Sequence, residues 1–333
     1  MRTLKAISLC CLVAAAARGD DPSPTPDGRV LTTRAGPVAF SPDGRMVFTG
    51  DDADRGMKVW DARSGERVRN VPRPAGVIRT VAWSPDGRLL AAGGSNKTVT
   101  LWDATTGREV HTLRGHTDVV HSIAFSPDSK TLVSGSSDKT VRLWDVGKGT
   151  EVRALSLPGP PAGAKPIPGM PCQVFAVAFS PDGKAVAAGG GDGLSEAGEM
   201  VLWDAGTGKL LRRLLGADEH EVFSVAFSPD GKLLAGGTTA GSIRLFDVRT
   251  GEVRREFRGG DQLRGLAISP DGRTLAAAIR KEVKLWDVGT GELKRTLRGH
   301  GNWVGSIAFS ADGKALASGG SDGVRLWTLA ADK

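Results

Sequence analysis

The stretch from Val38 to Gly44 reads Val-Ala-Phe-Ser-Pro-Asp-Gly, and Trp60-Asp61 follows it about twenty residues later. This pair of phrases recurs, with small variations, along most of the chain. The serine of the first phrase recurs at Ser41, Ser84, Ser126, Ser180, Ser228, Ser269 and Ser310, so successive copies are 43, 42, 54, 48, 41 and 41 residues apart. The second phrase recurs as Trp60-Asp61, Trp102-Asp103, Trp144-Asp145, Trp203-Asp204, Phe246-Asp247, Trp286-Asp287 and Trp327-Thr328. A unit of about forty residues buries its faces only by stacking against its own copies, so the period predicts a repeat architecture.

The third copy shows how one unit is built. We expect strands at residues 119–125, 131–135, 140–144 and 151–155, separated by turns. The turn Ser126-Pro127-Asp128-Ser129 fits this pattern because proline fixes φ at the second turn position. In most other copies glycine closes the same turn and supplies the positive φ. The sequence therefore predicts an all-β protein made of four-stranded units.

The two ends of the chain complement each other. The last copy finishes at Val324 to Thr328, so the fourth strand of its unit is missing from the C-terminus. The segment Gly28 to Thr33 resembles the other fourth strands, such as Gly251 to Arg254, and precedes the first unit. We expect residues 29–33 to complete the last sheet and close a ring, because closure leaves only short sheet edges exposed.

The N-terminus has the pattern of a secretory signal peptide. Arg2 and Lys5 precede the apolar stretch from Ala6 to Ala17, and small residues follow. The stretch is too short to cross a bilayer, which needs about 20 residues. We expect residues 1–19 to direct export to the periplasm or the medium, with cleavage near Ala17 or Gly19. The alternative is an apolar tail without a targeting role.

Composition limits the remaining organisation. Residues 20–28 are rich in proline and predict an extended linker, and residues 29–333 form one repeat domain, expected to be a monomer. After cleavage Cys172 would be the only cysteine, so no internal disulfide is expected. The net charge is +7, but the charges alternate in sign, which does not indicate nucleic-acid binding. No other apolar run is long enough to span a membrane.

The repeated phrases resemble those of the WD40 repeat family. The resemblance rests on the Ser-Pro-Asp-Gly turns, the Trp-Asp ends and the pairs Gly115-His116 and Gly299-His300, and it covers residues 29 to 329. It implies a seven-bladed β-propeller of four-stranded antiparallel sheets around a central channel. It also implies a bracing hydrogen-bond chain in each complete blade. Blades three and seven match that chain, with residues His116, Ser134, Asp138 and Trp144, and His300, Ser318, Asp322 and Trp327.

No grouping of residues points to catalysis, a cofactor or a metal. We find no glycine-rich phosphate loop, no His-Glu-x-x-His helix and no paired-cysteine zinc spacing. The repeated serines are turn residues, and no histidine recurs at a position that would serve them as a base. We therefore expect a protein without enzymatic activity, cofactor or metal. The alternative is an enzyme or small-ligand binder whose polar groups converge in the central channel from distant blades.

Partner-binding positions follow from the resemblance, because family members contact partners at the start of the first strand of each blade. Five residues before each repeated serine the types vary, whereas a purely structural position would repeat one type. The residues there are Gly36, Arg79, His121, Phe175, Phe223, Arg264 and Gly305. Seven residues before each serine stand Arg34, Val77, Val119, Gln173, Glu221, Gln262 and Trp303. Aromatic and arginine residues are the usual anchors of interfaces, so we predict partner contacts at Trp303, Phe175, Phe223, Arg79, Arg264 and His121.

Each candidate has a structural alternative. Trp303 would pack locally beside His300, Phe175 and Phe223 would fill the wedge between blades, and the arginines would be solvated charges. The insertions in blade four, residues 156–171 and 189–198, are either functional loops or tolerated lengthening. Cys172 is either an exposed thiol or a small buried residue. The sequence favours a scaffold that presents its top face to a protein or peptide. A cluster of ionisable groups in the channel would favour the enzyme, and an apolar, aromatic rim the scaffold.

Overall fold

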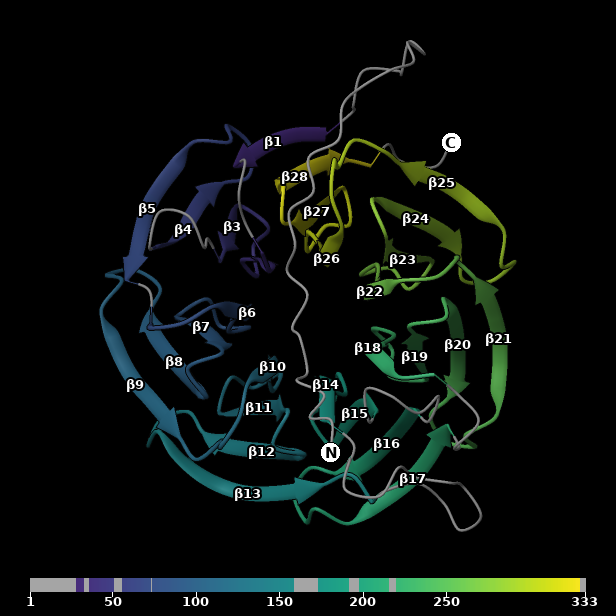
Figure 1. Ribbon diagram of the computed structural model, residues 1–333, viewed down its shortest axis with the longest axis horizontal. Coiled ribbons are helices and arrows are strands. Elements are labelled where there is room, and N and C mark those ends of the chain that lie inside the picture. The colour runs from purple at the N-terminus through teal and green to yellow at the C-terminus, as the bar shows by residue number, and fades with distance from the viewer. Residues whose placement is uncertain are drawn as a thin grey trace, which may run out of the picture.

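The computed structural model describes residues 28–32, 36–50, 56–72, 74–158, 173–191, 198–215 and 220–329. These residues form seven four-stranded antiparallel sheets, the blades, arranged as a ring around a central opening (Figure 1). Blade one begins with β2 and blade seven with β26. The structure thus confirms the predicted all-β, seven-bladed propeller.

Each blade runs outward from the opening in the order of the chain. The innermost strands are β2 (Val38–Phe40), β6 (Ile78–Trp83), β10 (Val120–Phe125), β14 (Gln173–Phe179), β18 (Val222–Phe227), β22 (Leu263–Ile268) and β26 (Val304–Phe309). The second strands are β3 (Met46–Thr49), β7 (Leu89–Gly94), β11 (Thr131–Ser136), β15 (Ala185–Gly191), β19 (Leu233–Thr238), β23 (Thr274–Ile279) and β27 (Ala315–Gly320).

The outer half of each blade repeats in the same way. The third strands are β4 (Gly56–Asp61), β8 (Thr98–Asp103), β12 (Thr140–Asp145), β16 (Gly198–Asp204), β20 (Ser242–Asp247), β24 (Glu282–Asp287) and β28 (Gly323–Thr328). The outermost strands are β5 (Arg67–Pro72), β9 (Glu109–Arg114), β13 (Thr150–Ser156), β17 (Leu210–Leu215), β21 (Val253–Arg258), β25 (Leu293–Leu297) and, from the other end of the chain, β1 (Gly28–Thr32).

The repeated phrases form turns that satisfy their own polar groups. In the first blade Ser41 Oγ–H donates to Asp43 Oδ1 at 2.5 Å, and the backbone N–H of Met46 donates to Ser41 Oγ at 2.9 Å. Gly44 has a φ of 69°, which only glycine adopts at little cost. The hydrogen bond from Ser41 is the main reason that the pKa of Asp43 is lowered. The same turn recurs in every blade, which explains why Ser, Asp and usually Gly are required there.

The hydrophobic core lies between the blades. Seven clusters of buried side chains occupy the seven junctions between neighbouring sheets. The Trp of the Trp-Asp phrase belongs to them: Trp102 packs with Phe48 and Met57 of the preceding blade, and all three are buried. A single blade therefore has no core of its own, which is the physical reason for the repeat.

The ring closes at the junction of blades seven and one. β1 pairs antiparallel with β28, with Gly28 opposite Trp327, so the N-terminal strand completes the last sheet (Figure 1). Leu31 of β1 lies in the cluster between these blades. The strand starts one residue before the expected range, and residue 33 lies outside the described residues. The predicted signal peptide and most of the predicted linker, residues 1–27, also lie outside them.

Basic side chains on the outermost strands link neighbouring blades at the rim. Each reaches a backbone carbonyl in the turn after the third strand of the next blade. Arg212, for example, donates to the carbonyl oxygens of Thr250 at 2.9 Å and Arg249 at 2.5 Å. Between residues that the structure describes, six side chains make this contact, and we call them the outer belt: Arg29, Arg69, His111, Arg153, Arg212 and Arg255.

Candidate functional site

A β-bulge lies at the start of the innermost strand in six of the seven blades, and in five of these it turns a side chain towards the central opening. In six blades the register of this strand with its neighbour skips one residue. A bulged residue is unpaired and its side chain is re-aimed. The skipped residues are Arg79, His121, Phe175, Phe223, Arg264 and Gly305, which all stand five residues before a repeated serine. Backbone geometry, not residue type, is therefore what repeats at this position.

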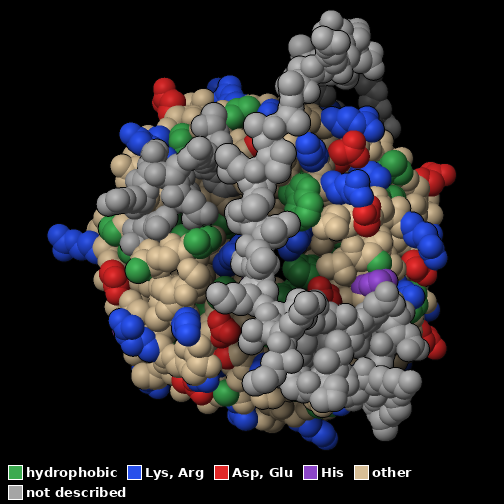
Figure 2. All heavy atoms as spheres, in the orientation of Figure 1, with side chains coloured by type: hydrophobic (Ala, Val, Ile, Leu, Met, Phe, Trp, Pro, Cys, Tyr) green, Lys and Arg blue, Asp and Glu red, His purple; other side chains and the backbone are tan. Residues whose placement is uncertain are grey.

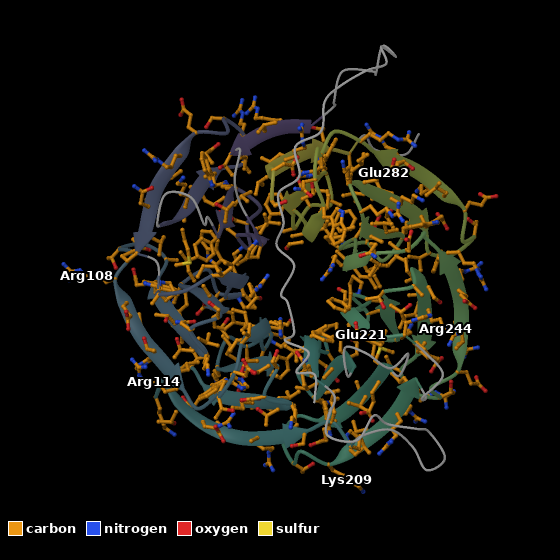
Figure 3. All side chains as sticks on the ribbon, viewed as in Figure 1. Arg108, Arg114, Lys209, Glu221, Arg244 and Glu282 are labelled. Carbon is orange, nitrogen blue, oxygen red and sulfur yellow. The ribbon has the colours of Figure 1, made fainter. Side chains whose placement is uncertain are left out.

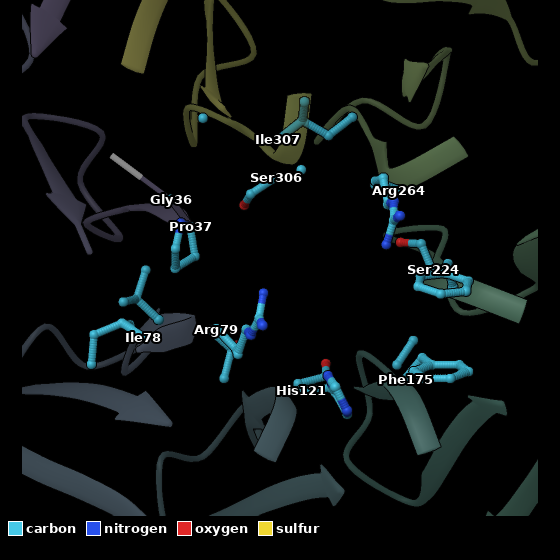
Figure 4. A pocket seen from close by; sticks show the side chains of 18 of the residues that line it. Gly36, Pro37, Ile78, Arg79, His121, Phe175, Ser224, Arg264, Ser306 and Ile307 are labelled. Carbon is cyan, nitrogen blue, oxygen red and sulfur yellow. The ribbon is translucent and has the colours of Figure 1, made fainter. Parts of the chain in front are cut away.

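These residues surround a cavity of about 430 Å³ at the centre of the ring. Gly36 of blade one (Figure 4) completes its wall. Trp303 of blade seven also lines it. We call this opening, lined by the six bulged residues together with Gly36 and Trp303, the channel mouth. On the face that Figure 2 shows, hydrophobic, basic and some acidic side chains are visible around the centre.

Five of these side chains form a continuous series of ring contacts across blades three to seven. The rings of His121 and Phe175 meet edge-on with centroids 5.3 Å apart, and those of Phe175 and Phe223 stack at 4.4 Å. The guanidinium carbon of Arg264 lies 4.8 Å from the ring of Phe223 and 5.5 Å from that of Trp303. We call this series the aromatic–arginine ladder: His121, Phe175, Phe223, Arg264 and Trp303. Such contacts stabilise each pair by about 0.5–1.5 kcal/mol, so the side chains hold one another in place.

His121 is a neutral member of the ladder. Burial, followed by the positive charge of Arg79, lowers the pKa of His121 to about 4. Its Nε2–H donates to Ser137 Oγ at 2.6 Å, and Ser137 in turn donates to Gln173 Oε1 at 2.7 Å. At neutral pH this imidazole is therefore an oriented, uncharged ring, and it is poorly suited to take up a proton as a general base.

Arg264 and Arg79 supply the positive charge of the channel mouth. Burial lowers the pKa of Arg264, the carboxylate of Glu221 opposes that shift, and the charge of Arg79 adds to it. Guanidinium groups carry a positive charge in proteins, so each of the two side chains brings one to the mouth. Figure 4 shows Arg79 extending towards the centre of the opening and Arg264 on the opposite wall.

A second cavity of about 700 Å³ adjoins the channel mouth at blade six, and we call it the blade-six groove. It is lined by Trp303 and by residues 259–262, 279–282 and 284. Trp303 lines both cavities, so its side chain forms the boundary between them. The blade-six groove is bordered by two non-glycine residues with positive φ, Gln262 at 67° and Arg280 at 51°. Such backbone conformations are uncommon outside glycine, and Lys97 and Lys139 adopt them in the turns of blades two and three that correspond to that of Arg280.

Two comparisons with known proteins fit this architecture. The family model described as "WD domain, G-beta repeat" matches residues 38–61, 107–145, 165–194 and 291–328. The model described as "Anaphase-promoting complex subunit 4 WD40 domain" matches residues 54–121 and 212–263. The chain carries WD40 repeats. It is also 31% identical over 62 residues to an uncharacterized WD repeat-containing protein of Synechocystis sp., a match that covers 19% of this chain and 18% of that protein.

The WD40 blades three and seven contain the expected hydrogen-bond chains. In blade three His116 Nδ1 lies 2.8 Å from Asp138 Oδ2, its Nε2 lies 2.7 Å from Ser134 Oγ, and Trp144 Nε1–H donates to Ser134 Oγ at 2.8 Å. In blade seven the same contacts join His300, Ser318, Asp322 and Trp327. Burial raises the pKa of Asp138, but hydrogen bonds from His116, Thr140 and the backbone of Thr117 lower it by more. The pKa of Asp138 therefore lies well below its usual range.

A set of hydroxyl groups beneath the mouth of the WD40 propeller had no counterpart in the sequence analysis. The residue after the bulge accepts a hydrogen bond from a backbone N–H of the next blade. Ser224 Oγ accepts from Leu266 at 2.9 Å, and Ser306 Oγ accepts from Val38 at 3.2 Å across the closing junction. Thr80 and Ser122 do the same at two other junctions. In the sequence these groups are marked by a Ser or Thr four residues before the repeated serine, and four of the seven copies have one there.

The structure brings the six predicted partner-binding residues together at one opening of the propeller. Trp303 is 45% exposed and contacts Arg264, while the ring of His300 faces Trp327. Phe175 and Phe223 stack on each other across the mouth of a blade junction. Most of both blade-four insertions, together with Cys172, lies outside the described residues. In the part of the chain that the structure describes, no three potential ligands cluster as a metal site and no helix could cross a membrane.

Proposed function

We propose that this WD40 propeller is a non-catalytic scaffold that binds a protein or peptide at the channel mouth. The observation that supports the proposal best is the aromatic–arginine ladder. It places rigid aromatic faces and an arginine, the side chains most used as interface anchors, around an opening on a preorganised ring. Because the ring holds these groups before binding, little conformational entropy is lost when a partner docks.

The proposal includes the setting in which the partner is met. The pattern of residues 1–19 supports export, so the partner would be a protein of the cell envelope or the medium. The propeller would act as a monomer with no preference for nucleic acid. WD40 propellers are in general scaffolds without catalytic activity, which agrees with this role.

A small-ligand function is the second candidate, because Arg79, His121 and Arg264 converge on the channel mouth. The mouth thus has an ionisable cluster, which would favour an enzyme, and an aromatic rim, which would favour a scaffold. We favour the scaffold because the pKa of His121 keeps this ring uncharged and a weak base at neutral pH. Among the described residues that line the mouth there is no carboxylate to complete an acid–base pair.

The test is an affinity capture from envelope and extracellular fractions with the full chain as bait. A variant with Phe175→Ala, Phe223→Ala and Trp303→Ala should lose a partner that the wild type retains. The matched control replaces three exposed valines of the outermost strands, Val68, Val152 and Val253, with alanine. This control removes apolar surface away from the mouth and should retain the partner.

Thermal unfolding of both variants is measured first, so that loss of binding is not confused with loss of fold. A partner retained equally by all three proteins would contradict binding at the channel mouth. If no protein is captured by the wild type, the scaffold proposal fails and the small-ligand candidate takes its place.

A further inference from the structure

The channel mouth carries two guanidinium groups but no acidic side chain in its lining. Its described lining residues comprise aliphatic residues, aromatic rings, hydroxyl groups, glycines, two arginines and one neutral histidine, without an Asp or Glu. Glu221 is the carboxylate whose charge acts on Arg264, and it lies at the inner side of blade five, outside that lining (Figure 3). Glu221 therefore offsets part of the charge of Arg264 from outside the lining, whereas no carboxylate of the described lining residues lies beside Arg79.

Arg79 and Arg264 differ in how firmly they are held. Arg264 is fixed between the rings of Phe223 and Trp303. No ion pair or hydrogen bond of the Arg79 side chain occurs within the described part of the chain, although that side chain points into the opening (Figure 4). The charge of Arg79 lowers the pKa of Arg264, which shows that the two groups repel each other. An anion placed between them would remove this repulsion and accept hydrogen bonds from both.

The surroundings favour an anion that is part of a chain. Trp303 lines both the channel mouth and the blade-six groove, so the two cavities adjoin on either side of this one side chain. Lys281 lies exposed in that groove, and Arg280 pairs there with Asp261. Glycines at positions 36, 259, 260 and 305 keep parts of the walls free of side chains, which lets a backbone approach closely.

We propose that the channel mouth binds an acidic side chain of an extended peptide segment of the partner. The carboxylate lies between Arg79 and Arg264, the neighbouring side chains of the segment pack on the ladder, and the segment continues over Trp303 into the blade-six groove. This inference rests on the proposed scaffold function and specifies the chemistry of the partner. The resulting pairs are charge-assisted hydrogen bonds inside a partly desolvated cavity, where they are strongest.

The experiment uses fluorescent libraries of short peptides whose central residue is fixed as Glu, Gln, Lys or Leu, with both termini blocked. Binding to the full chain is followed by fluorescence anisotropy. The Glu library should bind about tenfold more tightly than the Gln library, and this preference should weaken as salt rises. A fifth library with a free C-terminal carboxylate and no acidic side chain distinguishes a terminal carboxylate from an acidic side chain. Tighter binding of that library than of the Glu library would contradict the proposal.

Arg79→Gln is the main variant, because the Arg79 side chain has no described contact that the fold would lose. It should remove most of the preference for Glu over Gln, while Arg79→Lys should keep part of it. Arg108→Gln is the matched control: it makes the same change of net charge at the outer edge of blade two, where the side chain points away from the ring (Figure 3). It should leave the preference unchanged.

Two results would overturn the proposal. One is equal binding of the Glu and Gln libraries by the wild type. The other is a preference for Glu that survives both Arg79→Gln and Arg264→Gln. If a captured partner depends on Phe175, Phe223 and Trp303 but not on these arginines, the scaffold function stands and the acidic segment is excluded.

Discussion

The outer belt and the channel mouth are each built from equivalent positions in successive blades. The residue type is nearly constant around the belt, whereas it varies around the mouth. Around the belt five of six positions are arginine, and the sixth, His111, makes the same kind of contact with the backbone of the next blade. Around the mouth the bulged residues are two arginines, two phenylalanines, a histidine and a glycine.

The difference follows from what each position contacts. A belt residue donates to a backbone carbonyl in a turn that recurs from blade to blade. The same type of donor side chain therefore fits at each junction. A bulged residue at the mouth is skipped in the backbone pairing with the neighbouring strand, and its side chain faces the central opening. Its type is not dictated by the fold, so it is available for recognition. A repeated side chain thus indicates a structural role in this propeller, and variation on a repeated backbone indicates a functional one.

The largest expected effect is that of removing a repeated tryptophan. Trp144→Ala should lower the free energy of unfolding by about 3–5 kcal/mol, because Trp144 is buried between blades and braces Ser134. Trp303→Ala, at the exposed edge of the mouth, should lower it by less than about 1 kcal/mol. Urea unfolding followed by tryptophan fluorescence measures both. Equal losses would remove the distinction between the two classes of position.

The next effect concerns the carboxylate that braces blade three. Asp138→Asn should lower stability at neutral pH by about 2 kcal/mol, the usual contribution of a hydrogen bond to a charged group. The pKa of Asp138 is lowered in the folded protein, so its contribution is complete above the unfolded value near 4 and is lost as the pH falls through the folded value. Denaturant midpoints measured down to low pH should therefore converge for wild type and variant in acid. A gap that widened in acid would refute this assignment.

A moderate effect is expected for the belt. Arg212→Ala removes two hydrogen bonds to the turn of blade five and should lower the free energy of unfolding by about 1–2 kcal/mol. Peptide binding at the mouth should be unchanged. Arg79→Ala is the opposite case, with little change in stability. Chemical unfolding and peptide titration of the two variants separate the regions, and binding that failed in Arg212→Ala would show that rim and mouth are coupled.

The smallest expected effect is that of replacing the belt histidine, His111, with the arginine found at the other belt positions. His111 Nε2 lies 3.1 Å from the carbonyl oxygen of Gly147, a contact that arginine makes elsewhere in the belt. His111→Arg should change the free energy of unfolding by less than about 0.5 kcal/mol. His121→Arg, at the mouth, should by contrast break the edge-on ring contact with Phe175 and alter peptide binding. A large loss of stability in His111→Arg would mean that the belt is not interchangeable.

The candidate residues at the mouth could be predicted, but their arrangement could not. The Ser-Pro phrase marks the same backbone position in every copy, and Phe175, Phe223 and Arg264 stand at that position. The sequence gives no information on the register of the bulge, which is what turns these side chains inward. The outer belt was missed for a similar reason: an arginine on an edge strand looks solvated until the turn of the next blade is placed against it.

The sequence by itself determined the number of blades, the approximate bounds of the strands in the third blade and the closing role of the N-terminal segment. These are local properties, set by turn chemistry, the spacing of Trp and the likeness of residues 28–33 to the other fourth strands. Only the tertiary structure decided that five side chains from five blades form one ladder, that Arg79 and Arg264 share a cavity, and that Trp303 separates it from the blade-six groove. Residues about forty positions apart meet only when the ring closes, because the distances between them depend on the packing of whole blades.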